Sequence, residues 1–327
     1  MYNKLPGNTE LTNKKLLFSN MFSYYTSQNT NPFSKIPITY HISSGLQDPS
    51  FHSFLSDFKS NTQKNLKNIW IVKPGENTNR GAGIRIFDSL DPLTKYINQL
   101  QDPNRTFIIQ KYIENPLLIK MRKFDIRCYA LITSFQNNIQ GFFYRDGYLR
   151  TSAEEFSLKN VQNKFIHLTN DAIQKHSEKY GKFEDGNKLS YFEFQEYLEA
   201  VQSKICFFTQ ILPKIKELVK DTIEATYWKL NPNRKIQSFE LLGYDFMVDS
   251  DLRVWLIEVN TNPCLELSSP YLEHLIPKML DSAFALTVDQ VFPSYSSPLN
   301  DFEMIFNEST HKLLNNSNFP YTVNPIN

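Results

Sequence analysis

Three side chains that carry oxygen ligands stand near the ends of two neighbouring apolar runs. Asp245 lies in the first run, and Glu258 and Asn260 lie in the second. The Asp-Ser-Asp turn at 249–251 separates the runs, so a hairpin would bring the three side chains to one mouth. Mg²⁺ prefers a few carboxylate or amide oxygens together with nucleotide phosphates. The spacing therefore predicts a magnesium site at Asp245, Glu258 and Asn260.

The competing interpretation is a pair of core strands whose polar residues face water. It accounts for Asp249 and Asp251, which lie in the turn. It does not account for Glu258, which stands inside an otherwise apolar run, where an unpaired carboxylate costs free energy. Because buried acids are typical of functional sites, the metal-site hypothesis is favoured.

A cation and a glycine-containing loop follow the apolar run at 69–72. Lys73 ends that run, and the loop after it contains Arg80, Gly81 and Gly83. Such a loop lets the backbone approach phosphate oxygens while the lysine neutralises them. It is not a P-loop, because no Gly-Lys-Ser/Thr follows, and an ordinary hairpin loop explains the glycines equally well. Arg80 favours a phosphate site formed by Lys73, Arg80, Gly81 and Gly83.

A second strand end is formed by Gln110, Lys111, Tyr112 and Ile113, just before the Glu-Asn-Pro sequence at 114–116. A crossover between two sheets at this point can present backbone groups to the edge of an adenine, with Lys111 reaching phosphate. The alternative is a surface lysine after an edge strand, and this segment alone favours that alternative.

Charged and apolar residues alternate between positions 122 and 127. In a strand, Lys123, Asp125 and Arg127 share one face, opposite two apolar side chains. A solvated strand face would alternate in the same way. The row also suits an acidic substrate, because arginine binds carboxylates through paired hydrogen bonds and aspartate can hold an amine. Arg150, across a hairpin turn, supplies another carboxylate partner.

His167, Thr169 and Asn170 add compact polar groups farther along the chain. For His167 alone, a hydrogen-bonded structural histidine is the favoured interpretation. The three cysteines, Cys128, Cys206 and Cys264, are far apart and lack metal-ligand spacing, so we expect reduced thiols in an intracellular protein. We expect Cys264, beside the predicted metal loop, to be buried filler.

The bulk composition is that of a folded globular chain. It has 327 residues, 41% hydrophobic and 21% charged, with a net charge of +1. This length allows two domains or one large α/β unit, and the small net charge gives no indication of nucleic acid as a partner. No apolar run approaches the roughly 20 residues that a membrane span needs, and the start lacks a signal-peptide core. We expect a cytosolic protein without a membrane partner.

The pattern of apolar runs and turns predicts four parts. They are an N-terminal lead-in segment (1–65), a central lobe (66–113), a C-terminal lobe (114–293) and a loose tail (294–327). Strands are expected at 69–72, 84–87, 106–110, 125–133, 139–144 and in the two runs of the hairpin. Helices are expected at 10–22, at 92–100, within 191–230 and at 271–291.

Many of these motifs, in this order, resemble the tubulin tyrosine ligase and tubulin-tyrosine-ligase-like family. The matching stretches are residues 70–73, 109–112, 123–127, 144–150, 167–170, 174–175, 244–249 and 257–260. The similarity runs from about Leu5 to Pro293. It implies an α/β (α+β) ATP-grasp fold in which two sheet-bearing lobes clasp ATP, with the small first domain of the family missing.

The resemblance also implies roles for individual residues. Phosphates of ATP would contact Lys73 and Lys111, and adenine would contact residues 110–113. Mg²⁺ would contact Asp245, Glu258 and Asn260. The acceptor carboxylate, its acyl-phosphate or the incoming amino acid would contact Lys123, Asp125, Arg127 and Arg150, with Thr169 and Asn170 nearby.

The implied activity is ATP-dependent ligation of an amino acid to a carboxylate of tubulin through an acyl-phosphate. The enzyme would be monomeric and would act on the acidic tubulin tail at cytoplasmic microtubules, in the cilium or at the basal body. Residues 179–187 resemble tyrosine ligase and residues 260–263 resemble the ligase-like branch, so tyrosine, glutamate and glycine all stay open. The alternatives are a catalytically silent microtubule-binding protein of the same fold and an ATP-grasp ligase for a non-tubulin substrate.

Overall fold

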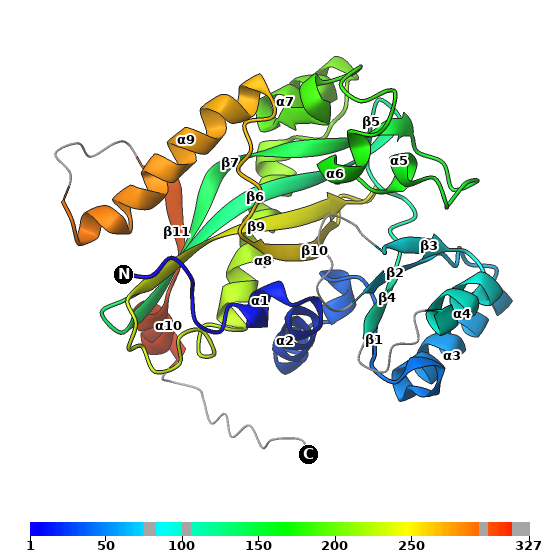
Figure 1. The fold of residues 1–327 in the computed structure, drawn as a ribbon, viewed down its shortest axis with the longest axis horizontal. Helices are drawn as coiled ribbons and strands as arrows, with labels where there is room; N and C mark the ends of the chain where they lie inside the picture. Colours follow the sequence, from blue (N-terminus) through cyan, green and yellow to red (C-terminus); the bar gives the residue numbers. More distant parts are fainter. Residues whose placement is uncertain (75–82, 100–105, 294–299, 316–327) are drawn as a thin grey trace.

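The fold combines two antiparallel sheets with helices on their outer faces (Figure 1). It is described here from a computed structural model, which covers residues 1–74, 83–99, 106–293 and 300–315. This confirms the predicted α+β class with two sheets. The helices are α1 (Thr9–Thr12), α2 (Lys14–Ser27), α3 (Pro49–Gln63), α4 (Leu90–Gln99), α5 (Lys164–His167), α6 (Asp171–Gln174), α7 (Tyr191–Ala200), α8 (Leu212–Glu224), α9 (Pro270–Ala285) and α10 (Glu308–Asn315).

The smaller sheet has the strand order β1-β4-β2-β3. Its strands are β1 (Thr39–Ile42), β2 (Trp70–Pro74), β3 (Arg85–Phe87) and β4 (Phe107–Lys111). Trp70, Val72 and Ile109 form a core with the aromatic face of α3, while helix α4 packs on the same side. Because side chains alternate along a strand, Lys73 and Gln110 point to the opposite face.

The larger sheet has the strand order β10-β9-β6-β7-β11, with β5 paired to β6 and β8 paired to β7. Its strands are β5 (Leu118–Ile119), β6 (Arg122–Phe135), β7 (Asn138–Glu155), β8 (Lys188–Ser190), β9 (Ser238–Val248), β10 (Val254–Thr261) and β11 (Phe302–Asn307). Helices α2, α7 and α8 bury one face of this sheet.

The other face of the larger sheet is only partly covered. Tyr129 and Leu131 of β6 lie under Leu275 and Met279 of α9. The residues that precede them on the same face, from 123 to 127, are not covered by α9 and line a cavity instead. The long strand β6 therefore supplies both a core face and the wall of a candidate site.

The secondary-structure predictions hold for most elements, with shifted ends. The helix expected at 10–22 is two helices, α1 and α2, since Asn13 is extended and caps α2 with its side chain. The helix expected at 271–291 starts at Pro270 after the capping Ser269 and ends at Ala285.

Two of the predicted parts of the chain require correction. Residues 1–65 are more than a lead-in, because β1 pairs with β4 of the smaller sheet and α3 covers that sheet. Residues 300–315 are not a loose tail, because β11 pairs with β7. The division into lobes stays a prediction. None of the helices in the described part of the chain combines the length and apolar character of a membrane span.

Candidate functional site

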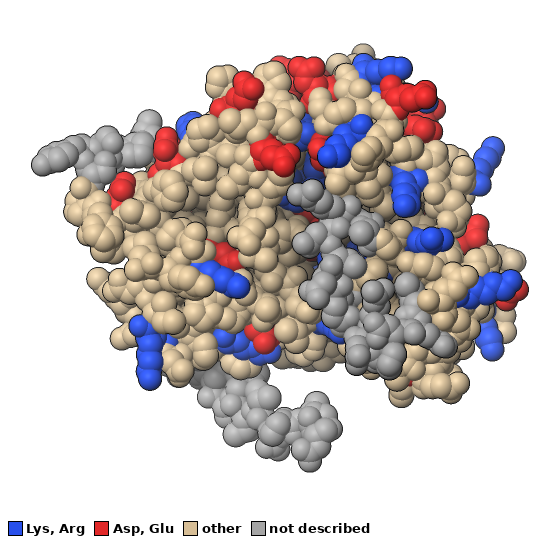
Figure 2. Space-filling model, in the orientation of Figure 1, with Lys and Arg blue, Asp and Glu red and all other residues tan. Residues whose placement is uncertain are grey.

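A cavity of about 620 Å³ lies between the inner face of the smaller sheet and the open part of the larger one. Figure 2 shows charged side chains of both signs spread over this side of the molecule, with basic side chains in the central hollow. Most of the predicted site residues line the cavity: Lys73, Gln110, Lys111, Tyr112, Ile113, Lys123, Asp125, Arg127, Arg150, Thr169, Asn170, Asp245, Glu258 and Asn260. Arg80 and Gly81 lie outside the described residues.

The hairpin of β9 and β10 brings the three predicted metal ligands together. Glu258 is the direct cross-strand partner of Asp245, and the Asn260 amide lies 3.4 Å from both carboxylates. A β-bulge at Ile257 makes this possible. Val254 and Leu256 face the core, and an unbroken strand would send Glu258 to the same side; the extra residue turns it toward the cavity.

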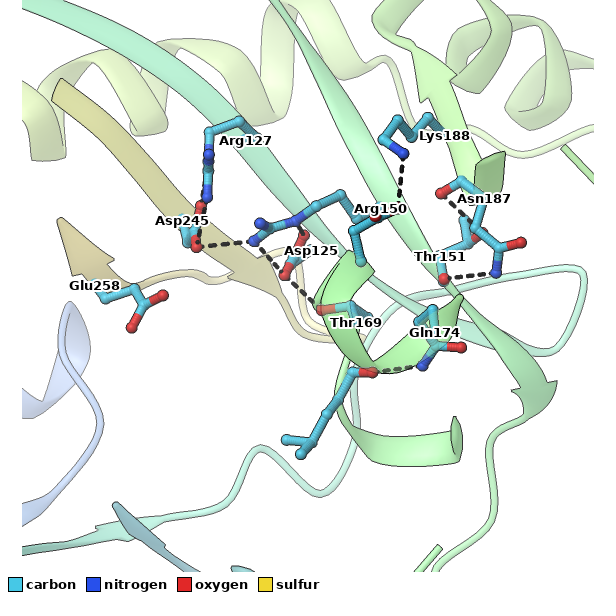
Figure 3. Close-up of polar contacts among 12 residues, drawn as sticks. Asp125, Arg127, Arg150, Thr151, Thr169, Gln174, Asn187, Lys188, Asp245 and Glu258 are labelled. Carbon is cyan, nitrogen blue, oxygen red and sulfur yellow. Dashed lines mark hydrogen bonds and ion pairs between the residues drawn. The ribbon is translucent and has the colours of Figure 1, made fainter. Parts of the chain in front are cut away.

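Asp245 is the centre of a buried ion network (Figure 3). Its carboxylate accepts hydrogen bonds from Arg127 Nε at 2.6 Å and forms an ion pair with Arg150 Nη2 at 2.8 Å. Burial alone would raise the pKa of Asp245, but the two arginines outweigh burial and hold that pKa well below its usual range. Burial alone would lower the pKa of Arg127, and Asp245 more than offsets that, so all three groups stay charged.

Asp125 extends the same network one pair farther along β6. It accepts Arg150 Nε at 2.7 Å and Nη2 at 2.8 Å, the two-pronged geometry in which arginine holds a carboxylate best. The hydroxyl of Thr169 donates to the same carboxylate. The row predicted from alternation is therefore a cavity wall, and it is buried, not solvated.

A glycine in β9 makes room for this network. A Cβ built on Gly243 would lie 2.8 Å from Pro263 and 3.3 Å from Arg127 Nη1. Any larger residue would push the guanidinium away from Asp245. The local sequence Leu-Gly-Tyr-Asp therefore serves the geometry of the site.

On the smaller sheet, Lys73 points into the cavity from the end of β2. Its ammonium donates to Gln110 Oε1 at 2.7 Å, and Gln110 donates in turn to Thr39 Oγ1 at 2.9 Å. Burial lowers the pKa of Lys73 to about 8, although Glu258 and Asp245 act in the opposite direction. A buried cation to which no acid of the described residues is directly bonded is suited to an anionic ligand such as a phosphate.

Lys123 is a second buried lysine in the cavity wall. It donates to the Tyr112 hydroxyl at 3.2 Å and to the His167 carbonyl at 2.8 Å. Burial lowers the pKa of Lys123 to about 7, with Asp125 opposing the shift and Lys73 adding to it. An anion bound in the cavity would therefore stabilise the charged form of both lysines.

His167 is held by two hydrogen bonds, as favoured from the sequence. Its Nδ1 lies 2.9 Å from the Tyr112 hydroxyl and its Nε2 lies 3.0 Å from the Asn160 carbonyl. Burial lowers its pKa to about 4, so the ring is neutral at pH 7. Together with Ile71, Ile84, Tyr112 and Leu168 it lines an apolar part of the cavity.

The role predicted for the Lys111 side chain is contradicted. Lys111 lies on the α3 side of β4, where its ammonium donates to the carbonyls of Lys67 and Ile69, pairs with Glu114 and lies 5.5 Å from the Trp70 ring centre. Side-chain alternation points the Gln110 side chain into the cavity and the Lys111 ammonium away from it. Lys111 therefore lines the cavity without presenting its charge to it.

Two smaller expectations also change. Gly83 does not line the cavity; it adopts a positive φ of 72°, and its carbonyl accepts the Tyr96 hydroxyl at 2.7 Å, so its role is in the turn. Cys264 is exposed at the cavity wall and is not buried filler.

Two cations of the cavity wall carry no clear signal in the sequence. Lys14, the first residue of α2, lies 3.5 Å from Glu258, although 244 positions separate them. Lys188, the first residue of β8, is buried beside Asp171 of α6. Neither belongs to a local motif, because long-range packing alone brings each of them to the site.

The donor set of the hairpin fits a magnesium ion. Asp245, Glu258 and Asn260 present carboxylate and amide oxygens once the Asn260 amide is turned about its last bond. Among the described residues no group of three or more His, Cys, Asp or Glu side chains is placed to hold a metal. That excludes a zinc-type cluster in this part of the chain and agrees with a set of two acids and one amide.

Two antiparallel sheets facing each other across a cation-rich cavity define the class of ATP-grasp-like proteins. The chain also matches the model of the Tubulin-tyrosine ligase family over residues 1–298. It therefore belongs to the tubulin-tyrosine ligase family.

Similar curated proteins are glycine-adding enzymes by name. Tubulin glycylase 3B of Tetrahymena thermophila is 35% identical over 68% of this chain and 18% of its own length. Tubulin glycylase 3D of the same organism is 37% identical over 71% of this chain and 22% of its own length. Tubulin monoglycylase TTLL3 of Homo sapiens is 34% identical over 74% of this chain and 31% of its own length. The chain thus spans about a fifth to a third of the length of these relatives.

Proposed function

We propose that the protein is an ATP-dependent ligase that adds an amino acid to a carboxylate of tubulin, with glycine favoured over glutamate and tyrosine. Membership of the family supports ligation, and the names of the similar proteins favour glycine. The single observation that carries the proposal is the cavity in which Lys73 of the smaller sheet faces Lys123, Asp245 and Glu258 of the larger sheet. Cations for a triphosphate and oxygens for its metal ion meet there.

The nucleotide would lie between the sheets. The apolar cavity wall around Tyr112 and Leu168 would contact the adenine, and the backbone at 110–113 would bind its edge. Lys73, Lys123 and Lys14 would contact the phosphates. Asp245, Glu258 and Asn260 would hold Mg²⁺, which supplies charge neutralisation at the phosphates when it is bound.

The proposed chemistry needs no nucleophilic side chain. A glutamate carboxylate of the tubulin tail attacks the γ-phosphorus, the bond to the β-phosphate oxygen breaks, and ADP leaves. The amine of the free amino acid then attacks the acyl carbon, phosphate leaves with the C–O electron pair, and the amine loses a proton to solvent or a nearby base. Lys123 and Arg127 would stabilise the negative charge that develops on the transferred group.

The remaining parts of the proposal concern the whole protein. We propose a central lobe that carries Lys73 and a C-terminal lobe that carries Asp245, closing together on ATP so that water is kept from the acyl-phosphate. The partners would be the acidic tail of tubulin and a free amino acid, with a monomeric enzyme working on microtubules in the cytoplasm, cilium or basal body.

The test is a ligation assay with the full chain. Purified protein, ATP, Mg²⁺ and microtubules are combined with radiolabelled glycine, glutamate or tyrosine, and the modified tail residue is located by mass spectrometry. We expect incorporation of one amino acid, and none with a Lys73→Met variant. A folded, ATP-binding protein that incorporates none of the three overturns the proposal. Binding to microtubules without nucleotide binding would favour the silent alternative, and turnover on another protein would favour the non-tubulin ligase.

A further inference from the structure

The contact between helices α2 and α8 contains side chains that can ionise. Tyr25 of α2 donates a hydrogen bond to Asp221 Oδ2 of α8 at 2.6 Å. Tyr24 donates to Glu224 Oε2 at 2.5 Å and lies 3.5 Å from Asp221 Oδ1. Burial raises the pKa of both tyrosines, so their hydroxyl groups keep their protons. The strength of this contact therefore depends on the charge of the two acids.

Asp221 is the less favourably placed of these acids. It is 9% exposed, and Glu217 and Glu224 lie one helical turn before and after it on the same side of α8. Within the described part of the chain no cation forms an ion pair with it, because Lys35 pairs with Glu217 at 3.0 Å instead. Burial and the two neighbouring carboxylates raise the pKa of Asp221 to about 6, although the Tyr25 hydrogen bond and Lys35 act in the opposite direction.

The remaining charged groups at this contact face Glu224. Lys220 Nζ lies 3.3 Å from Glu224 Oε1, and Nδ1 of His311, on α10, lies 3.4 Å from the same oxygen. Glu224 Oε2 is left to accept the Tyr24 hydroxyl. Glu224 is thus surrounded by basic groups, whereas Asp221 is surrounded by acids and tyrosines. As the pH falls, Asp221 is the acid of this contact that takes up a proton.

Helix α2 contacts both sheets of the molecule. Leu17 and Tyr25 belong to the core of the larger sheet. Leu17 and Phe18 also line a small cavity together with Thr39 and Ile108 of the smaller sheet. Figure 1 shows α2 between β10 and the smaller sheet. A change in how firmly α8 holds α2 therefore acts on both sheets.

We propose that Asp221 is a pH-sensitive switch in the contact between α2 and α8: its protonated carboxyl group holds α2 firmly, and its charged form weakens that hold. The protonated Oδ1 would donate to the Tyr24 hydroxyl, which already donates to Glu224, while Oδ2 keeps the hydrogen bond from Tyr25. Loss of the proton removes this donor and places a third negative charge beside Glu217 and Glu224. The switch acts through the position of α2 and does not depend on the proposed ligase function.

The hold on α2 should tighten as the pH falls through about 6. In an unfolded chain the pKa of an aspartate is about 3.9, so the folded protein binds the extra proton between about pH 4 and 6. The stability that this proton contributes is lost as the pH rises through 6. The unfolding constant, divided by that of a variant without the titrating group, should therefore rise roughly tenfold between pH 5 and 7.5.

The test compares Asp221→Asn with the unaltered chain. Asparagine keeps the size of the side chain and supplies a permanent N–H donor toward Tyr24, so it imitates the protonated acid. Asp281→Asn, at an exposed acid of α9, is the control. Denaturant unfolding and hydrogen exchange of the α2 amides, corrected for the intrinsic effect of pH, are measured between pH 5 and 7.5.

We expect corrected exchange in α2 to become roughly tenfold faster between pH 5 and 7.5 in the unaltered and Asp281→Asn proteins, and to stay constant in Asp221→Asn. Glu217→Gln should move the midpoint of this change to lower pH, because one repelling charge is removed. The same pH dependence in Asp221→Asn as in the unaltered protein overturns the proposal.

Two further variants make the result decisive. His311→Gln should leave the pH dependence in place; its loss in that variant would assign the titration to the histidine and overturn the proposal. If Asp221→Asn does not fold, Glu217→Gln decides the question, and an unmoved midpoint overturns the proposal.

Discussion

Single carboxylates of this site serve more than one partner. Asp245 holds Arg127 and Arg150, and Glu258 lies 3.5 Å from Lys14 while facing the same hairpin mouth. Asp245 Oδ1 has one hydrogen-bond donor among the described residues, so a lone pair remains for a metal ion. Glu258, about one-fifth exposed, is the freer of the two acids. The proposed magnesium site should therefore depend most directly on Glu258.

We predict that Glu258→Gln reduces ligation at least about 100-fold, because it removes charge from the metal site while keeping the volume of the side chain. The fold should be retained, since Glu258 contributes no core packing. The measurements are turnover, magnesium-dependent ATP binding and the thermal unfolding midpoint. Glu303→Gln, which alters an exposed acid of β11, is the matched control and should leave turnover unchanged. Normal ligation by the Glu258→Gln variant would show that the metal assignment is wrong.

The two buried lysines predict how ATP binding depends on pH. The pKa of Lys73 is lowered to about 8 and that of Lys123 to about 7, both by burial. Bound phosphates favour the charged ammonium, so ATP binding should take up protons between pH 7 and 9. Affinity should fall as pH rises through this window, by at most tenfold per pH unit for each proton taken up.

Calorimetry in buffers of different ionisation enthalpy measures that proton uptake. Lys73→Met should bind ATP more weakly at pH 7 and should show a shallower fall toward pH 9. Lys59→Met, at an exposed position of α3, is the control. The ligand-free protein should behave in the opposite sense: its unfolded chain binds more protons above pH 7, so its free energy of unfolding should rise with pH. Affinity independent of pH between 7 and 9 would contradict the proposed contacts of both lysines.

Among the elements, strands with a clear period of two could be predicted well. The row at 123–127 alternates between charged and apolar residues, so the sequence shows which residues share a face. It does not show whether the charged face is exposed to solvent or buried. In β4 the residues Phe107, Ile108 and Ile109 are apolar, so both faces of the strand look alike in the sequence. The sequence therefore does not show that the Lys111 side chain points away from the cavity. The sequence does not show that the helix expected at 10–22 divides at Asn13, because the division depends on the Asn13 side chain capping α2.

One buried acid helps to attach the N-terminal segment to the larger sheet, beside backbone hydrogen bonds between Tyr2 and the start of β9. Glu240 of β9 accepts the Leu5 amide at 2.9 Å, the Asn8 side chain at 2.8 Å and the Thr261 hydroxyl. We predict that Glu240→Ala destabilises the protein by roughly 3 kcal/mol, because several buried donors lose a charged acceptor. It should also loosen the segment that leads to Lys14 and so weaken ATP binding.

Denaturant unfolding and hydrogen exchange of residues 5–12 check this prediction. Glu240→Gln, which keeps one oxygen acceptor and the side-chain volume, should have a smaller effect on both. Increased exchange confined to the N-terminal segment in the alanine variant would agree with its role as an attachment point. Unchanged stability and unchanged exchange would mean that other contacts hold this segment, such as the hydrogen bond from the Asn231 amide to the Pro6 carbonyl.

At the scale of the whole molecule, the site exists only between two sheets that are far apart in the sequence. Lys73 and Glu258 are brought near each other by tertiary packing, as are Lys14 and Glu258. Local patterns could predict the strands and their end residues, and the motif order indicated the family. They could not predict the pairing of Arg150 with Lys188, because the connection between β7 and β8 has no regular period that would set a register.

We predict that ATP with Mg²⁺ stabilises both sheets together. At 100 times its dissociation constant, a ligand of the folded state adds about 2.7 kcal/mol to the free energy of unfolding. For a chain of this size that raises the unfolding midpoint by several degrees. Hydrogen exchange should slow in β2 and β4 as well as in β9 and β10, whereas AMP should protect the smaller sheet more than the larger. Protection limited to one sheet would contradict a nucleotide that contacts both.

The extra residue in β10 sets the parity of everything after it. Were Ile257 taken up into the regular pleat, the rest of the strand would rotate by half a turn, so that Glu258 and Asn260 would enter the core and Val259 would face the cavity. No side chain with chemistry would have been exchanged, yet the predicted metal-binding oxygens would be inverted and an unpaired carboxylate buried. Deletion of Ile257 would not have this effect, because Glu258 would then follow Leu256 directly and keep its place opposite Asp245.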